Sequence, residues 1–268
     1  MTQQELETLT LSVCEVAKRA GSFIRQERQQ FHAESIQRKH AHDYVSYVDK
    51  QSEQLIVSAL RQLLPEAGFI TEEGSATYTD EQYCWVVDPL DGTTNFIHHF
   101  PPYAVSIALM QGPRIVLGVV YEICADECFY AWLGGGSHLN GEPLTVNPSP
   151  LSDALVCFQL PYDSDAYSPV AQSLIRQFYG RVASVRMLGS AAIALCYVAA
   201  GRLDAYAEKY IGQWDYMAGA LIVSEAGGCC TDYEGSDHFT QGNSIVATNG
   251  IIHQSILQGV RDVMSLRR

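Results

Sequence analysis

The residues best suited to chemistry in this chain are two aspartates three positions apart, Asp88 and Asp91. They follow the apolar run 85–87 and are separated by Pro89 and Leu90. Two acids at the end of a buried strand predict a cation site, because Mg²⁺ takes oxygen ligands, usually a few carboxylates together with substrate phosphate. The alternative is a surface turn, since aspartate and proline are common turn residues. We favour the cation site, because neighbouring buried acids are costly unless they are paired or bind a metal.

A glycine turn follows the two aspartates. Gly92, Thr93 and Thr94 place their backbone amides directly after Asp91, and amides at a helix start are well suited to bind phosphate. We therefore expect Gly92 and Thr93 to contact the substrate. Because Pro89 cannot continue a central strand ladder, we expect the strand to stop near Asp88.

The composition indicates a globular protein and excludes several kinds of partner. The chain has 268 residues, 47% of them hydrophobic and 18% charged, so it can bury a sizeable core and is not disordered. Its formal net charge of -13 argues against binding to nucleic acid or to an anionic membrane. An acidic protein that binds an anionic phosphate needs local positive charge, which bound metal ions would supply.

Neither the N-terminus nor the cysteines indicate secretion. Residues 1–5 are not followed by the basic and apolar regions of a signal peptide, and no apolar stretch has the length of a membrane span. The eight cysteines are scattered, and Cys14, Cys84, Cys157 and Cys196 lie among hydrophobic neighbours, as reduced cysteines do. We therefore expect a cytoplasmic protein without membrane attachment.

The hydrophobic pattern predicts a mixture of helices and strands. Helices are expected at about residues 4–30, after Asp49 up to Leu64, and at residues 169–179, 191–200, 216–226 and 251–264. Strands are expected at residues 68–71, 83–88, 104–110, 115–121, 127–133, 155–159, 204–207, 228–232 and 244–248. Asn140-Gly141 indicates a tight hairpin. Helices and strands without strict alternation predict the α+β class.

Three separate motifs resemble the signatures of one enzyme family. Residues 85–96 resemble the first signature of the inositol monophosphatase family of Mg²⁺-dependent, lithium-sensitive phosphatases. Residues 214–228 resemble a second signature and residues 70–74 a third. Their order and spacing match the family, and the similarity covers nearly the whole chain. The resemblance implies a layered α/β/α/β/α sandwich of the sugar-phosphatase type and a homodimer.

The resemblance also implies a set of metal ligands. They are the backbone carbonyl of Leu90 and the side chains of Glu72, Asp88, Asp91 and Asp215. This set implies two or three Mg²⁺ ions. Asp215 follows Trp214 at an expected helix start, where an aspartate is also a good cap. The match to the family's tryptophan–aspartate motif favours the ligand role.

Catalytic roles are implied for Glu72, Thr93 and Asp49. In the family pattern Thr93 orients or deprotonates the attacking water and is supported by Asp49. Residues 43–49 resemble the family's D-L-V-T-x-x-D stretch, with Ser46 in place of the usual threonine, so the hydroxyl is kept. Asp49 also reads as the N-cap of the following helix, and both roles are compatible. Lys39 is better interpreted as an exposed lysine of a charged loop.

The implied substrate contacts are Gly92, Thr93, Gly189, Ser190, Ala191, Glu208 and Asp215. Residues 189–192 resemble a substrate loop of the family, although Ser190 also reads as a helix cap. Glu208 lies seven residues before Asp215, where inositol-specific members carry a hydroxyl-binding glutamate. Its alternative is an ordinary exposed acid at a strand end. Thr94 stands where relatives with other substrates often have lysine.

Pro148-Ser149-Pro150 is the best candidate for a boundary within the chain. We expect an N-terminal α+β half, residues 1–147, that carries most of the metal ligands. We expect a C-terminal α/β half, residues 148–268, that carries Asp215 and the substrate-recognition loops.

The function that the resemblance implies is Mg²⁺-dependent hydrolysis of a small phosphorylated polyol or sugar, with myo-inositol monophosphate as the first candidate. Fructose 1,6-bisphosphate, a nucleotide 3′-phosphate and histidinol phosphate are alternative substrates. A mainly regulatory role is a further alternative, because some bacterial relatives bind transcription machinery. Catalysis is favoured, because a protein that only binds partners has no need of Glu72, Asp88, Asp91 and Asp215 together.

Overall fold

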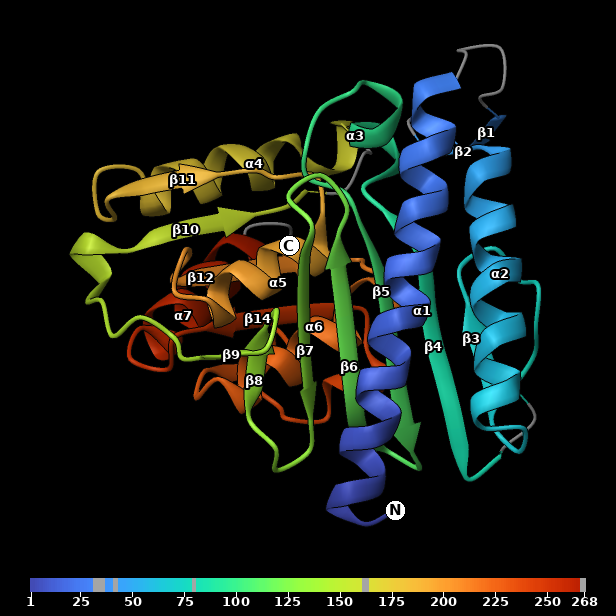
Figure 1. The fold of residues 1–268 in the computed structure, drawn as a ribbon. Helices are drawn as coiled ribbons and strands as arrows, with labels where there is room; N and C mark the ends of the chain where they lie inside the picture. The colour runs from blue at the N-terminus through green and yellow to red at the C-terminus, as the bar shows by residue number, and fades with distance from the viewer. Residues whose placement is uncertain (31–36, 41–42, 79–80, 161–163, 266–268) are drawn as a thin grey trace.

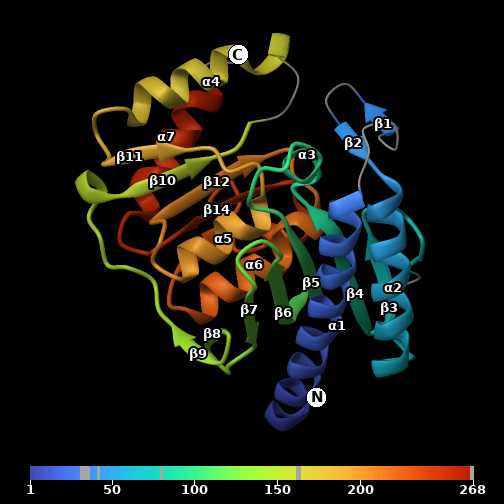
Figure 2. The same cartoon turned by 45° about the horizontal axis from the view of Figure 1, so that its top comes forward.

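The structure is a computed structural model and describes residues 1–30, 37–40, 43–78, 81–160 and 164–265. Its elements stack in five layers, α/β/α/β/α, as the resemblance implied (Figure 1). Helices α1 (Gln3–Gln30) and α2 (Tyr47–Leu63) cover one face of a seven-stranded sheet. Helices α5 (Ala191–Ala199) and α6 (Gln213–Glu225) lie between this sheet and a five-stranded sheet. Helices α4 (Ser164–Phe178) and α7 (His253–Ser265) cover the far face of the second sheet (Figure 2).

The larger sheet has the order β3-β4-β5-β6-β7-β8-β9, and only β3 and β4 are parallel. Its strands are β3 (Gly68–Thr71), β4 (Tyr83–Asp91), β5 (Ala104–Gln111), β6 (Arg114–Glu122), β7 (Glu127–Trp132), β8 (Ser137–Leu139) and β9 (Glu142–Leu144). The smaller sheet has the order β11-β10-β12-β14-β13. Its strands are β10 (Leu155–Phe158), β11 (Ser184–Arg186), β12 (Ala205–Lys209), β13 (Cys229–Thr231) and β14 (Ser244–Thr248). Strands β1 (Gln37–His40) and β2 (Asp43–Val45) form a separate hairpin.

Strand β5 shows why the sequences of the strands in the larger sheet are almost continuously apolar. Successive side chains of a strand point to opposite faces. Ala104 and Ala108 therefore pack into the core shared with α5 and α6, whereas Val105, Ile107 and Leu109 pack against the outer helices. A sheet that is covered on both faces needs apolar residues at almost every position.

Helix α6 is the central element, and apolar residues surround it. Residues 216–223 are all buried, as expected for a helix packed between two sheets. Its approach to β6 is set by Gly118, where a Cβ atom would lie 2.6 Å from the carbonyl oxygen of Ala218. Because this contact joins two backbones, a side chain at Gly118 would push the helix away from the sheet.

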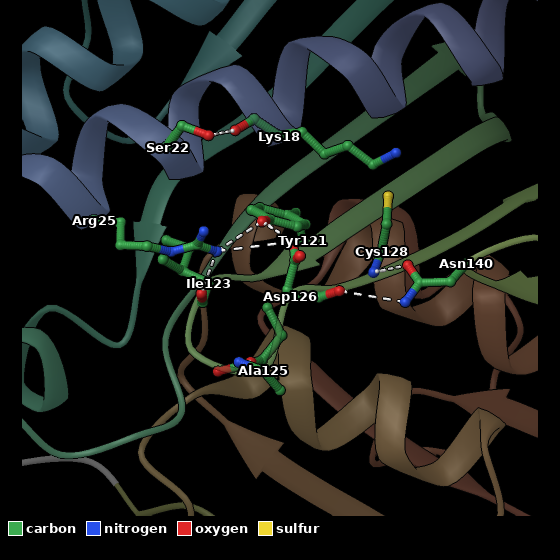
Figure 3. Close-up of polar contacts among 10 residues, drawn as sticks. Lys18, Ser22, Arg25, Tyr121, Ile123, Ala125, Asp126, Cys128 and Asn140 are labelled. Carbon is green, nitrogen blue, oxygen red and sulfur yellow. Dashed lines mark hydrogen bonds and ion pairs between the residues drawn. The ribbon is translucent and has the colours of Figure 1, made fainter.

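The outer helix α1 is fastened to the same sheet by polar contacts (Figure 3). The Arg25 guanidinium donates to the Tyr121 hydroxyl over 2.8 Å and to the Ile123 carbonyl over 2.7 Å. At the neighbouring hairpin, the Cys128 amide donates to the Asn140 side chain over 2.9 Å. The Arg25 bonds hold α1 against the end of β6, and the Cys128 bond ties β7 to the turn between β8 and β9.

Several element boundaries differ from the sequence predictions. Strand β4 does not stop near Asp88 but continues through Pro89 to Asp91. The proline is accommodated because it lies at an irregularity of the pairing with β5, where no regular ladder bond is required of it. Helix α2 begins at Tyr47, with Ser46 rather than Asp49 as its N-cap. Helix α4 begins at Ser164, so Pro169 lies inside it and does not open it. The strands β1, β2 and β11 and the short helix α3 (Thr93–Ile97) had no predicted counterpart.

The hairpin predicted at Asn140-Gly141 is confirmed. Asn140 and Gly141 join β8 and β9 in a hairpin, and both have the positive φ that such a turn requires. All eight cysteines are free thiols. Among the residues that the structure describes, no helix has the length and apolar character needed to cross a bilayer. The division at residues 147 and 148 stays a prediction.

Candidate active site

An irregularity in β4 turns its two aspartates toward the same face of the sheet. Residues three apart on a regular strand point to opposite faces. In β4, however, Asp88 pairs with Ser106 and Asp91 pairs with Ala104, so three steps on β4 match two steps on β5. This extra residue is a β-bulge, which re-aims side chains next to functional sites. Pro89 lies in the bulge, where it breaks no regular ladder.

Asp215 reaches the same place from α6. It is the third residue of that helix, and its Oδ2 atom accepts a hydrogen bond from the Gly212 amide over 2.8 Å. The N-cap of α6 is therefore Gly212 and not Asp215, and the Asp215 side chain binds the amide of this N-cap from the third helical position. One carboxylate oxygen from each of Asp88, Asp91 and Asp215 lies within 4.8 Å of the other two. This cluster joins residues from the larger sheet and from the central helix.

The charges of this cluster oppose one another. Burial raises the pKa of Asp88 well above its usual range, and the carboxylates of Glu72, Asp91 and Asp215 raise it further. Burial and the charge of Asp91 do the same to the pKa of Asp215. Burial raises the pKa of Asp91 to about 6, although its hydrogen bonds oppose the shift. A divalent cation fits this donor set, because it removes the repulsion and Mg²⁺ prefers carboxylate oxygens.

Glu72 lies at the edge of the cluster. It follows β3 directly, and its amide donates to the Val87 carbonyl over 3.2 Å, which continues the pairing of β3 and β4. The side chain is half-buried, and its charge acts on both Asp88 and Asp215. Glu72 is not among the three carboxylates that lie within 4.8 Å of one another, and its role as a metal ligand remains a prediction.

Thr93 and Asp49 are in direct contact, as the resemblance required. The Thr93 hydroxyl lies 2.9 Å from Oδ1 of Asp49 and 3.0 Å from the carbonyl oxygen of Leu90. Oδ2 of Asp49 accepts from the Ser46 amide over 2.8 Å and from the Ser46 hydroxyl over 2.7 Å. Burial raises the pKa of Asp49, and the bonds from Ser46 and Thr93 oppose that shift. A threonine that gives its only proton to Asp49 keeps its lone pairs for a water molecule.

The loop at residues 189–192 is tied to Asp91. The carboxylate of Asp91 accepts bonds from the Ser190 hydroxyl, from the Ala192 amide over 2.9 Å and from the Ala191 amide over 3.3 Å. Ser190 is also the N-cap of α5, so its structural role is present. Gly189 has a φ of 72°, and a Cβ atom there would lie 3.0 Å from Oδ1 of Asn95. The loop thus orients Asp91, and its contacts with a substrate remain predictions.

Glu208 lies on β12 and is half-buried rather than fully exposed. It accepts a hydrogen bond from the hydroxyl of the buried Tyr206, which points to the same face of the strand. Burial raises the pKa of Glu208 to about 8, and the charge of Asp91 adds to the shift. The charge of Asp91 thus acts on Glu208, and the contact of Glu208 with a substrate remains a prediction.

Two site neighbours were not anticipated. Glu53 lies four residues after Asp49 on the same face of α2, but its residue type gave no indication of the loop that it binds. Tyr206 belongs to no motif of the sequence, and its hydrogen bond to Glu208 was not predicted. His98 and His99 lie at the end of α3 and are not members of the carboxylate cluster. The side chain of Lys39 lies outside the described residues.

We expect Mg²⁺ to raise the melting temperature of the metal-free protein more at about pH 8 than at about pH 5. A carboxyl whose pKa is raised on folding stabilises the fold when protonated, and this contribution is lost as the pH rises through the folded pKa. For Asp91 the loss falls between its ordinary pKa of about 4 and about 6. Above that range a cation replaces the missing proton.

Differential scanning calorimetry in chelator, with and without added Mg²⁺, measures this difference. In Asp91→Asn the pH dependence of the Mg²⁺ effect should shrink. If Mg²⁺ raises the melting temperature of the unmodified protein equally at both pH values, these carboxylates do not bind the cation.

Comparisons with known proteins identify the family of this chain. Residues 5–265 match the model of the inositol monophosphatase family. The chain is 36% identical to an inositol-1-monophosphatase of Mesorhizobium japonicum, over 94% of this chain and 96% of that protein. It is 40% identical to Nus factor SuhB of Pseudomonas aeruginosa, over 91% and 93%. The structure of extragenic suppressor protein suhB from Bartonella henselae superposes with a TM-score of 0.88 at 34% identity, over 94% and 98%. The structure of inositol monophosphate bound SaIMPase-II superposes with a TM-score of 0.80 at 27% identity, over 96% of each chain. The chain belongs to the inositol monophosphatase family.

Proposed function

We propose that this chain is a Mg²⁺-dependent phosphomonoesterase that hydrolyses myo-inositol monophosphate to myo-inositol and inorganic phosphate. The observation that carries the proposal is the cluster of Asp88, Asp91 and Asp215 beside the Thr93–Asp49 pair. Membership of the family supports phosphatase activity. The number of bound ions is proposed to be two or three, with Glu72 and the Leu90 carbonyl completing the ligand set.

The residues divide the work of the reaction. Mg²⁺ in such a site is a Lewis acid that activates water and offsets the negative charge of the phosphoryl group. Thr93 holds the attacking water through a lone pair of its hydroxyl, while its proton is donated to Asp49. The amides that follow Gly92 are the first donors of α3 and have no partner within that helix, so they are placed to bind a phosphate oxygen. No protein nucleophile is required.

The polyol part of the substrate is proposed to meet Glu208 and the loop at residues 189–191. A carboxylate accepts hydrogen bonds from hydroxyl groups, and Tyr206 fixes the orientation of this one. A relative of known structure was solved with inositol monophosphate bound, which supports the same substrate class here. Lithium sensitivity and a homodimer belong to the proposal on the strength of the resemblance alone. The free cysteines support a cytoplasmic location.

The first test is a panel of phosphate esters assayed for phosphate release with Mg²⁺ and with chelator. We expect release from myo-inositol monophosphate only with Mg²⁺, and faster than from fructose 1,6-bisphosphate, a nucleotide 3′-phosphate or histidinol phosphate. A faster reaction with one of those three esters would make that ester the proposed substrate, and the proposed Mg²⁺-dependent hydrolysis would stand.

A second candidate function is binding to a protein partner. It is favoured by relatives named Nus factor SuhB, one of them 40% identical to this chain. The net charge of -13 argues that such a partner is a protein rather than nucleic acid. Absence of any Mg²⁺-dependent turnover across the panel would favour this second function.

We expect Glu208→Ala to slow the hydrolysis of myo-inositol monophosphate selectively. Above about pH 8, where Glu208 is ionised, the loss of a hydrogen bond to this charged group costs about 1.5–3 kcal/mol, which is roughly a tenfold to hundredfold decrease in kcat/KM. Hydrolysis of p-nitrophenyl phosphate should change much less, because that ester has no ring hydroxyl. Both rates are measured on one preparation, with the exposed Glu234→Ala as control. Equal losses on both esters would assign Glu208 to the support of the fold or of the cation site.

A further inference from the structure

One turn of α2 contacts three separate segments of the proposed site. Asp49, Ser52 and Glu53 lie three and four residues apart, so they share one face of the helix, and all three are buried. Asp49 accepts from Thr93, and Ser52 donates to the Pro89 carbonyl in the β4 bulge over 3.1 Å. The third residue, Glu53, reaches the loop that carries Glu72.

Glu53 binds this loop with both carboxylate oxygens. Oε2 accepts from the Glu73 amide over 2.7 Å, and Oε1 accepts from the Ser75 amide over 2.8 Å. The two amides lie on either side of Gly74, whose φ of 72° makes the turn. Hydrogen bonds to an ionised carboxylate are about twice as strong as neutral ones. The fully buried carboxylate of Glu53 is therefore satisfied by holding the two arms of one tight turn.

Glu72 is thereby held from two sides. Its own amide donates to Val87, at the end of the pairing between β3 and β4, and the next amide along the chain is held by Glu53. The backbone of Glu72 cannot shift without breaking one of these bonds. Helix α2 and strand β3 lie side by side on the outer side of the molecule (Figure 1, Figure 2), so the link between them is short.

We propose that Glu53 is a positioning residue, which sets the place of the Glu72 carboxylate for cation binding by clasping the Glu73 and Ser75 amides. This inference rests on the cation role proposed for Glu72. Glu53 itself does not touch the cation or the substrate. Residues that orient metal ligands typically contribute a factor of about 10–100 in metal affinity.

The test uses Glu53→Gln in the full chain. Glutamine keeps the shape, but its NH₂ group faces one of the two amide donors, so one bond of the clasp is lost. In metal-free protein we expect faster hydrogen exchange at the Glu73 and Ser75 amides, measured by NMR. By calorimetry we expect Mg²⁺ to bind about 10- to 100-fold more weakly.

Glu225→Gln is the matched control. Glu225 holds a second glycine turn in the same manner, with its two oxygens on the Gly134 and Gly136 amides over 2.8 and 3.0 Å. It lies ten residues beyond Asp215 on α6, about 15 Å along the helix. We expect faster exchange at its own turn and an unchanged Mg²⁺ affinity. Equal loss of Mg²⁺ affinity in both variants would mean general loosening and would overturn the proposal.

A second variant acts from the loop side. Ser75→Pro removes the amide that Oε1 accepts while leaving Glu53 in place, and the exposed side chain of Ser75 makes loss of the fold unexpected. We expect weaker Mg²⁺ binding here as well, and this variant decides the matter if Glu53→Gln does not fold. Unchanged Mg²⁺ affinity in a folded variant overturns the positioning role and leaves the proposed function intact. Failure of the unmodified protein to bind Mg²⁺ overturns both.

Discussion

We expect Asp91→Asn to lower the rate of phosphate release by at least about 10³-fold at saturating Mg²⁺. A bound metal contributes several kcal/mol of charge stabilisation in the transition state, and each 1.36 kcal/mol is a factor of ten in rate. Asparagine keeps the shape of Asp91 but removes the charge that draws a cation into the cluster. Asparagine keeps one oxygen, which can retain the shorter bond from the Ala192 amide, while the longer bond from the Ala191 amide to the other oxygen is lost. Ser190 still caps α5, so the start of that helix should stay in place.

Both turnover and the melting temperature of the metal-free protein are measured. The melting temperature shows whether the variant is folded, so a loss of turnover in a folded variant can be assigned to loss of the cation. Asp204→Asn is the matched control, because Asp204 is also buried and also accepts from a backbone amide, that of Leu155, over 2.7 Å. The control should lose stability and keep its rate per folded molecule. An Asp91→Asn variant that retains most of the unmodified rate at saturating Mg²⁺ would remove Asp91 from the cation site.

The second large effect is expected at Thr93. Thr93→Val preserves the shape of the side chain and deletes the hydroxyl that lies between Asp49 and the Leu90 carbonyl. Proton transfer by a positioned side chain typically contributes about 10²–10⁴-fold, so we expect kcat to fall within that range. Mg²⁺ affinity should change little, because the hydroxyl is not among the proposed ligands.

Thr93→Ser keeps the hydroxyl and is expected to retain most of the activity. Steady-state kinetics on both variants, with Mg²⁺ affinity from calorimetry, give the comparison. If serine lowers kcat as much as valine does, the hydroxyl that serine keeps is not sufficient for activity, and the proposed role of Thr93 in holding water is wrong.

Much of the fold could be predicted because the informative signals are local. Strands β3 and β14 have the predicted bounds, since each is a short apolar run between turn residues. The boundaries that failed depend on partners elsewhere in the chain. Pro89 was expected to end its strand, yet β4 continues because β5 pairs with both sides of the bulge. That partner is invisible in the local sequence.

The proposed site divides in the same way. Asp88 and Asp91 lie three positions apart in the chain and were indicated by their own spacing, whereas Asp215 needed the family resemblance. Glu53 was missed because its function is to accept two backbone amides from a distant loop. Such bonds leave no trace in residue type, since any amide can be the donor. Side chains that recognise other side chains are thus easier to predict than those that recognise backbone.

The contact between Gly118 and Ala218 has a consequence for how this site tolerates change in the core. The spacing between α6 and β6 is set by two backbones in contact, and no side chain lies between them at this point. Substitutions of nearby core side chains therefore alter the filling of the core without altering the distance across which Asp215 faces the β4 bulge. Thermal resistance and reaction geometry are uncoupled by this contact, so sequences can drift widely in the core while the carboxylates keep their spacing.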